Sequence, residues 1–220
     1  MVSDNLKALY EKLPSAVKLV AVSKFHPVSR LMEAYDAGQR LFGENRPQEL
    51  AQKVPQMPAD VEWHFIGHLQ TNKLKLVLPY VSLVQSVDSF HLLEAIDKWG
   101  RENGKTVDVL LELHLGAEET KHGFSEEEIL AVIGAGEPPL ENVRIRGLMG
   151  MATNTEEEGV VEADFARIEA LFQRIRAEHP ELRETFTELS IGMSGDWPIA
   201  VRHGATMVRI GTDIFGEREY

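Results

Sequence analysis

Short apolar runs recur along the whole chain, and a polar turn follows each of them. The first occupies residues 18–24, Lys-Leu-Val-Ala-Val-Ser-Lys, and is rich in valine. A continuous apolar run of this length, followed by a helical pattern, is typical of a strand buried on both faces of a parallel sheet. Seven further segments have the same character: residues 41–45, 61–66, 81–87, 107–115, 143–148, 188–191 and 207–210.

Amphipathic segments with helical spacing precede and separate these runs. They predict helices over residues 5–11, 27–37, from Pro47 onward, and over 72–78, 89–103, 125–133, 156–178 and 196–203. Asp88 is the predicted N-cap of the 89–103 helix, and Ser125 with Glu128 is a predicted capping box. The longest helix, 156–178, carries these apolar residues on one face: Phe165, Ile168, Leu171, Phe172 and Ile175.

The alternation of eight strand and helix units predicts the fold class α/β, as a (β/α)8 barrel of the TIM type. A doubly wound open sheet is the alternative, because alternation alone does not show that a sheet closes. The number of units favours the barrel. With 220 residues and no linker-like segment, we expect one domain over residues 1–220.

Composition narrows the class of function. No apolar run is long enough to cross a bilayer, the first residues have no apolar segment of the signal-peptide kind, and the chain has no cysteine. We therefore expect a cytoplasmic protein without disulfides, membrane contact or cysteine-bound metal. The net charge of −12 argues against a nucleic-acid partner, whose binding depends on Lys and Arg neutralising phosphates.

Lys24 is the first candidate for chemistry, since it follows a buried strand at the edge where α/β barrels carry their active sites. Burial disfavours an ammonium, lowers its pKa and makes the amine a nucleophile toward aldehydes. A lysine that only ends a strand and extends into water is the structural alternative.

Two late segments are candidate phosphate loops. Gly192-Met193-Ser194-Gly195 follows one strand and precedes a helix, and Gly211-Thr212 follows the final strand. Both offer hydroxyl groups and backbone N–H donors, and barrels often bind phosphate after their last two strands. Arg209, just before the second loop, points either into the barrel or toward a helix.

Several motifs resemble those of the pyridoxal phosphate homeostasis family, small proteins similar to the barrel of bacterial alanine racemase. They cover the chain from end to end in the family's order. The matching segments are Ala21-Val22-Ser23-Lys24, Phe42-Gly43-Glu44-Asn45, residues 63–73 (WHFIGHLQTNK), Lys121-His122-Gly123-Phe124, Arg146-Gly147-Leu148-Met149, residues 189–196 (LSIGMSGD) and 209–216 (RIGTDIFG).

The resemblance implies a pyridoxal 5′-phosphate (PLP) site with Lys24 as the Schiff-base lysine. It implies that Ser194, Gly195, Gly211 and Thr212 hold the phosphate, that Arg209 faces the pyridine nitrogen, and that Asn45 and Met149 line the pocket. An arginine does not give up its proton, so it leaves the pyridine nitrogen unprotonated and weakens the ring as an electron sink.

His114 departs from the family pattern, which usually has an asparagine there, and we assign it no role. No metal site is expected: His64 and His68 lie four residues apart across a strand and its loop rather than on one helix face.

The resemblance implies a PLP-binding protein of intracellular PLP homeostasis with little or no turnover and no catalytic residue. In alanine racemase a tyrosine from a further domain of the partner subunit supplies the second base. We expect that domain to be absent here, and of the tyrosines, Tyr220 included, none follows a strand. A weak PLP-dependent enzyme, such as an amino-acid racemase, is the first alternative, and a phosphosugar or nucleotide enzyme is the second. The expected partners are PLP and PLP-dependent apo-enzymes as recipients, and a monomer is expected.

Overall fold

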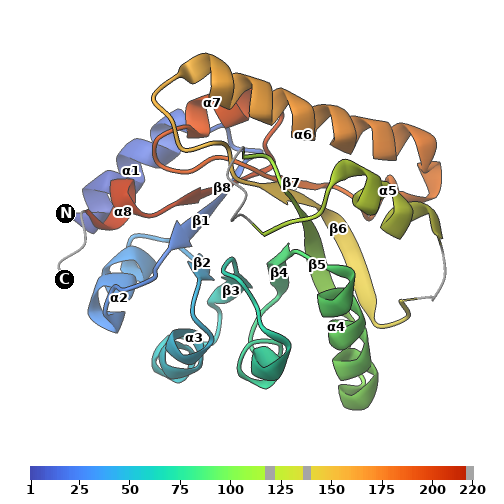
Figure 1. Cartoon of the computed structure of the whole chain (residues 1–220). Coiled ribbons are helices and arrows are strands. Elements are labelled where there is room, and N and C mark those ends of the chain that lie inside the picture. The colour runs from blue at the N-terminus through green and yellow to red at the C-terminus, as the bar shows by residue number, and fades with distance from the viewer. Residues whose placement is uncertain (117–121, 136–139, 217–220) are drawn as a thin grey trace.

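The eight apolar runs form eight parallel strands that close into a barrel, seen along its axis in Figure 1. In the computed structural model, which describes residues 1–116, 122–135 and 140–216, each strand pairs with the next and β8 returns to β1. The closed barrel is confirmed, and an open sheet is excluded. The strands are β1 (Lys18–Val22), β2 (Leu41–Glu44), β3 (Glu62–Phe65), β4 (Leu83–Val87), β5 (Val107–Leu113), β6 (Val143–Gly150), β7 (Glu188–Ser190) and β8 (Met207–Ile210).

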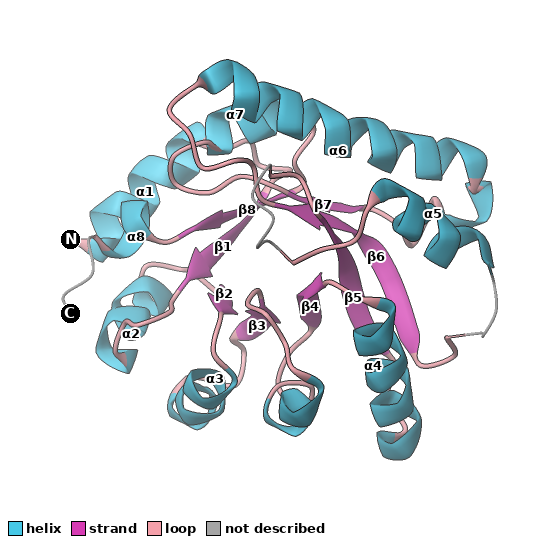
Figure 2. Cartoon of the chain, in the orientation of Figure 1, coloured by secondary structure: helices cyan, strands magenta, loops and turns pink. Residues whose placement is uncertain are grey.

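Helices surround the barrel, as Figure 2 shows, and both ends of the chain lie on the same side of it. They are α1 (Val2–Lys12), α2 (Val28–Asp36), α3 (Pro47–Lys53), α4 (Phe90–Asn103), α5 (Glu126–Ala135), α6 (Glu158–Glu178), α7 (Trp197–Arg202) and α8 (Thr212–Phe215); short 3-10 helices span Val54–Gln56, Thr71–Leu76 and Pro180–Leu182. None of the helices in the described ranges is long and apolar enough to cross a membrane.

Two capping predictions have different outcomes. The capping box is confirmed: the Glu128 N–H donates to Ser125 Oγ over 3.2 Å, and the Ser125 N–H donates to Glu128 Oε2 over 2.8 Å. The prediction for α4 is wrong, because its N-cap is Ser89, whose Oγ accepts from the Leu92 N–H at 3.3 Å. The carboxylate of Asp88 is therefore left for other partners.

The hydrophobic core has two parts. The larger part lies between the strands and the surrounding helices, and includes the fully buried Phe42, Phe65 and Phe165. The smaller part fills the interior of the barrel with Val20, Leu83, Leu110, Met149 and Met207. Alternate strand residues face opposite sides, so the interior positions above and below this apolar layer belong to the same strands.

A bulge in β6 changes the direction of one charged side chain. Val109 pairs with Ile145 and Leu110 pairs with Gly147, so Arg146 has no partner in the ladder. Gly147 has φ +152°, and a Cβ there would lie 1.7 Å from the carbonyl oxygen of Glu188. A glycine is required at this position because the neighbouring strand comes so close.

Candidate functional site

A cavity of about 230 Å³ opens at the C-terminal end of the barrel, among the loops that follow the strands. Seven of the eight predicted site residues line it together with Val22, His26, Ile66, Met151, Met193 and Gly216; the seven are Lys24, Asn45, Ser194, Gly195, Arg209, Gly211 and Thr212. The structure thus brings together residues from the first and last strands, which neighbour each other only because the barrel closes.

Met149 does not line this cavity. It is 1% exposed and packs in the apolar layer inside the barrel with Leu83 and Leu110. Because β6 continues to Gly150, the residue that reaches the cavity is Met151, two positions further on and on the same face. The expectation that Met149 lines the pocket is corrected to Met151.

A buried cluster of charges holds the turn that carries Lys24. The Lys53 ammonium donates to the carbonyl oxygen of Ser23 (2.8 Å) and to the carboxylates of Glu44 (2.6 Å) and Glu49 (2.7 Å). Glu49 in turn accepts from the Phe25 N–H at 2.7 Å. The residues on both sides of Lys24 are therefore fixed by α3.

The backbone of this turn is strained at Phe25, the residue after Lys24. Phe25 has φ +66°, in the left-handed region that a bulky residue rarely adopts, at a cost of roughly 1–2 kcal/mol. The guanidinium of Arg46 lies 4.3 Å from the centroid of its ring. Lys53 is 5% exposed, and burial raises the pKa of Glu44 while the ammonium of Lys53 opposes that rise.

The two predicted phosphate loops lie side by side and supply donors that the protein does not use. The backbone N–H groups of Ser194, Gly195 and Thr212 donate to no group in the described part of the chain. A Cβ on Gly195 would meet nothing within 4 Å, so the space before it is open. The first loop keeps its shape through the Met193 N–H, which donates to Asp196 Oδ1 at 2.5 Å.

Arg209 points into the barrel, which decides between the two directions left open by the sequence. Its Nη1 donates to the carbonyl oxygen (2.7 Å) and Oγ (2.6 Å) of Ser190, and its Nη2 donates to the carbonyl oxygen of Gly150 (2.9 Å). Burial lowers the pKa of Arg209 to about 10, and the charges of Glu112 and Asp196 oppose the change. The guanidinium thus keeps its proton at neutral pH.

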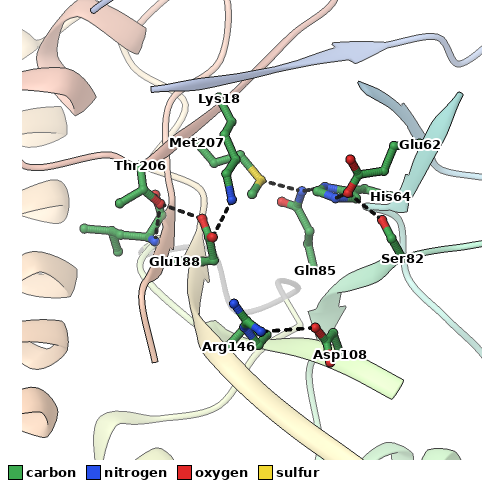
Figure 3. Close-up of polar contacts among 11 residues, drawn as sticks. Lys18, Glu62, His64, Ser82, Gln85, Asp108, Arg146, Glu188, Thr206 and Met207 are labelled. Carbon is green, nitrogen blue, oxygen red and sulfur yellow. Dashed lines mark hydrogen bonds and ion pairs between the residues drawn. The ribbon is translucent and has the colours of Figure 1, made fainter. Parts of the chain in front are cut away.

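A chain of hydrogen bonds runs from Arg209 through the barrel toward its N-terminal end. Ser190 Oγ donates to Gln85 Oε1 (2.6 Å), and Gln85 Nε2 lies 2.8 Å from His64 Nδ1. His64 Nε2 is 3.4 Å from Glu62 Oε1. Figure 3 shows the part of this hydrogen-bond series that contains Gln85, His64 and Glu62.

Arg209 determines which group donates and which accepts in each of these hydrogen bonds. A guanidinium has donors only, so Ser190 Oγ accepts from Arg209 and gives its single hydrogen to Gln85 Oε1. The amide of Gln85 then presents its N–H to His64 Nδ1, which must accept. The proton of a neutral His64 therefore lies on Nε2, facing the carboxylate of Glu62.

His64 and Glu62, at the end of this hydrogen-bond series, line a second cavity of about 210 Å³ at the N-terminal end of the barrel. Charged side chains surround it in Figure 3: Lys18 pairs with Glu188 at 2.5 Å, and Arg146 Nη1 lies 3.5 Å from Asp108. Within the described residues, Arg146 Nε is buried and has no hydrogen-bond partner.

Glu112 is a site residue that the sequence analysis did not identify. It is a buried carboxyl group inside the barrel, two residues after Leu110 in β5. Burial, with the charge of Asp88 as a smaller cause, raises its pKa to about 7, against the effect of Arg209. A signal was present: a carboxylate within an apolar strand is rare without a partner. Among the other motif residues, His64 lies near Glu62 and His68 lies near Asp88, and Lys121 and Tyr220 lie outside the described residues.

The fold and the cavity define a barrel of the alanine racemase class. The sequence profile described as "Alanine racemase, N-terminal domain" matches residues 1–219. The chain is 35% identical over 232 residues to the pyridoxal phosphate homeostasis protein of Haemophilus influenzae, with 100% of this chain and 97% of that protein covered. It is 39% identical over 207 residues to the protein of the same name from Aquifex aeolicus, with 94% and 89% covered. The chain belongs to the pyridoxal phosphate homeostasis family.

Solved structures of the same family superpose on this barrel. PipY of Synechococcus elongatus without PLP is 38% identical and superposes with a TM-score of 0.92 over 98% of this chain and 100% of that one. PipY with PLP bound gives 0.87 at 37% identity, over the same shares of the two chains. An alanine racemase of Clostridium difficile, 14% identical, gives 0.77 over 100% of this chain and 60% of its own, and shares the fold.

Proposed function

We propose that this chain binds PLP in the C-terminal cavity and serves PLP homeostasis in the cytoplasm, with little or no turnover. The observation that carries the proposal is the convergence of one lysine, one buried arginine and two phosphate-type loops on a single cavity. The names of its relatives and the PLP-bound structure of PipY support it.

The residues present fit the cofactor. The N–H groups of Ser194, Gly195 and Thr212 donate to no acceptor among the described residues, which suits a phosphate dianion. Asn45 Oδ1 is buried and, in the described part of the chain, has no partner, so a ligand donor at this position satisfies it. The same cavity holds Lys24, the one lysine among its described lining residues.

PLP supplies an aldehyde that bonds to a primary amine, and Lys24 Nζ is the proposed point of attachment. The protein's own work is then to position and to control protons. Lys53 and Glu49 hold the turn on both sides of Lys24. Arg209, which the resemblance assigns to the pyridine nitrogen, would keep its proton on the guanidinium and would not transfer it to that nitrogen.

A weak PLP-dependent enzyme, such as an amino-acid racemase, is the second candidate. His26 lines the cavity with Lys24 and is an imidazole able to move a proton, whereas no tyrosine is among the described lining residues. We keep the carrier as the first candidate, acting as a monomer that passes PLP to apo-enzymes. Assays for exchange of the amino-acid α-proton separate the two.

The experiment is the visible spectrum of the purified chain with added PLP, for the wild type, Lys24→Ala and the exposed-lysine control Lys98→Ala. We expect the band of lysine-bound PLP in the wild type and the control, and none in Lys24→Ala. Borohydride reduction followed by peptide mapping should place the adduct on Lys24. A wild type without this band at any PLP concentration contradicts the proposal and favours a different phosphorylated ligand, such as a phosphosugar or a nucleotide.

A further inference from the structure

Three loops at the C-terminal end of the barrel bring two imidazoles to one carboxylate. His68 follows β3, Asp88 follows β4, and His122 lies between β5 and α5. The side-chain atoms that can ligate a metal all lie within 4.8 Å of one another. None of these residues lines the proposed PLP cavity.

The distances suit a metal cation. A tetrahedral cation with bonds of 2.0–2.1 Å to nitrogen and oxygen separates its ligand atoms by about 3.4 Å. His68 Nδ1 lies 2.8 Å and His122 Nδ1 lies 3.8 Å from the same Asp88 oxygen, Oδ2, on either side of that value. The two rings are stacked, with centroids 4.1 Å apart and planes 17° from parallel, and both direct Nδ1 to the carboxylate.

The carboxylate of Asp88 is available to bind a cation because the neighbouring helix α4 does not use it. Ser89, not Asp88, caps α4, so the carboxylate of Asp88 is not used by the helix. Its side chain is 8% exposed, whereas those of His68 and His122 are 45% and 61% exposed. A fixed, buried carboxylate thus lies beneath two imidazoles that solvent reaches, which gives an ion a path of entry.

We propose that His68, Asp88 and His122 bind a divalent transition-metal cation of the Zn²⁺ class, with a fourth position open to water. Two imidazoles and a carboxylate are the ligands that Zn²⁺, Co²⁺ and Ni²⁺ accept. The sequence did not indicate the site because its ligands come from three separate loops, and the only close histidine pair, His64 and His68, is not the one that forms. The bound cation joins the loops after β3, β4 and β5. This proposal does not depend on PLP binding.

The test is a Co²⁺ titration of the untagged chain after treatment with EDTA, followed by visible absorption, with competition by Zn²⁺. We expect one Co²⁺ per chain, with the intense bands of four-coordinate cobalt, and displacement by Zn²⁺. Asp88→Asn and His122→Ala should each weaken binding by at least roughly tenfold. His179→Ala, at an imidazole that contacts Glu181 and none of the three proposed ligands, and Lys24→Ala should leave it unchanged.

His122 is exposed, so its substitution leaves the fold intact, and circular dichroism of each variant checks this. Absence of stoichiometric Co²⁺ binding, or equal affinity in the wild type and His122→Ala, overturns the proposal. Loss of PLP binding in the same preparations would instead concern the PLP cavity.

Discussion

Glu112 gives a prediction whose size follows directly from the structure. The carboxyl group is 6% exposed, and its pKa is raised from 4.5 to about 7, first by burial and then by the charge of Asp88. At about 1.4 kcal/mol per pH unit, this difference is worth about 3 kcal/mol. Since the folded state holds the proton more tightly than the unfolded state, the stabilisation is complete below pH 4.5 and is lost as the pH rises through 7.

Glu112→Gln should remove most of this dependence, because glutamine has nearly the same shape as the protonated side chain and does not ionise. Urea unfolding of the apo protein with EDTA should give similar free energies for variant and wild type at pH 5. At pH 8 the variant should be more stable by about 2–3 kcal/mol. Glu94→Gln, at an exposed position of α4, is the matched control and should behave as the wild type at both values.

An equal difference in the free energy of unfolding between variant and wild type at pH 5 and at pH 8 would contradict a raised pKa of Glu112. Titration of the Glu112 carboxyl group near pH 4.5, followed by carbon NMR, would contradict it equally. Other groups also titrate over this range, so only the difference between variant and wild type at each pH counts.

Three further substitutions test the scaffold. Lys53→Met should lower the free energy of unfolding by about 3–5 kcal/mol, since it leaves the carboxylate of Glu44 buried without a cation, and adding Glu44→Gln should restore part of the loss in urea unfolding. Gln85→Leu should cost about 2 kcal/mol in the same assay by breaking the interior hydrogen-bond chain, and nitrogen NMR should show a changed tautomer of His64. Gly147→Ala should lower thermal stability by roughly 3 kcal/mol or more, since its Cβ meets the backbone of β7; an unchanged melting temperature would contradict the observed φ angle.

The barrel could be predicted because its signals are local. Each strand is a separate apolar run, and all eight were found at their places, although the structure ends β1 at Val22, before Ser23 and Lys24. α8 was missed because four residues are too few to show helical periodicity. The N-cap of α4 was misplaced by one residue because Asp88 and Ser89 are both good capping residues.

The site was predictable where its residues follow strand ends, and less so within the strands. Seven expected residues line the cavity. Met149 does not, since it packs in the apolar layer inside the barrel, and the sequence did not show that β6 extends to Gly150. Lys53 could not be connected to Lys24 from the sequence, since the contact depends on how α3 packs against the end of β1. The roles of Lys24, Asn45, Ser194 and the other cavity residues toward PLP remain predictions.

A continuous series of hydrogen bonds inside the barrel runs from the C-terminal cavity to the N-terminal cavity. Its direction is set at Arg209, and it ends at His64, beside the N-terminal cavity. A protonated His64 has no acceptor at Nδ1, so it forces the amide of Gln85 to turn and removes the acceptor of Ser190. If PLP binds more tightly to one of these two hydrogen-bond arrangements, a ligand in the N-terminal cavity that prefers one of them changes PLP affinity, and PLP changes the affinity of that ligand by the same factor. Substitutions around the N-terminal cavity, such as those of His64, are therefore expected to change the measured affinity for PLP, as substitutions in the PLP cavity would.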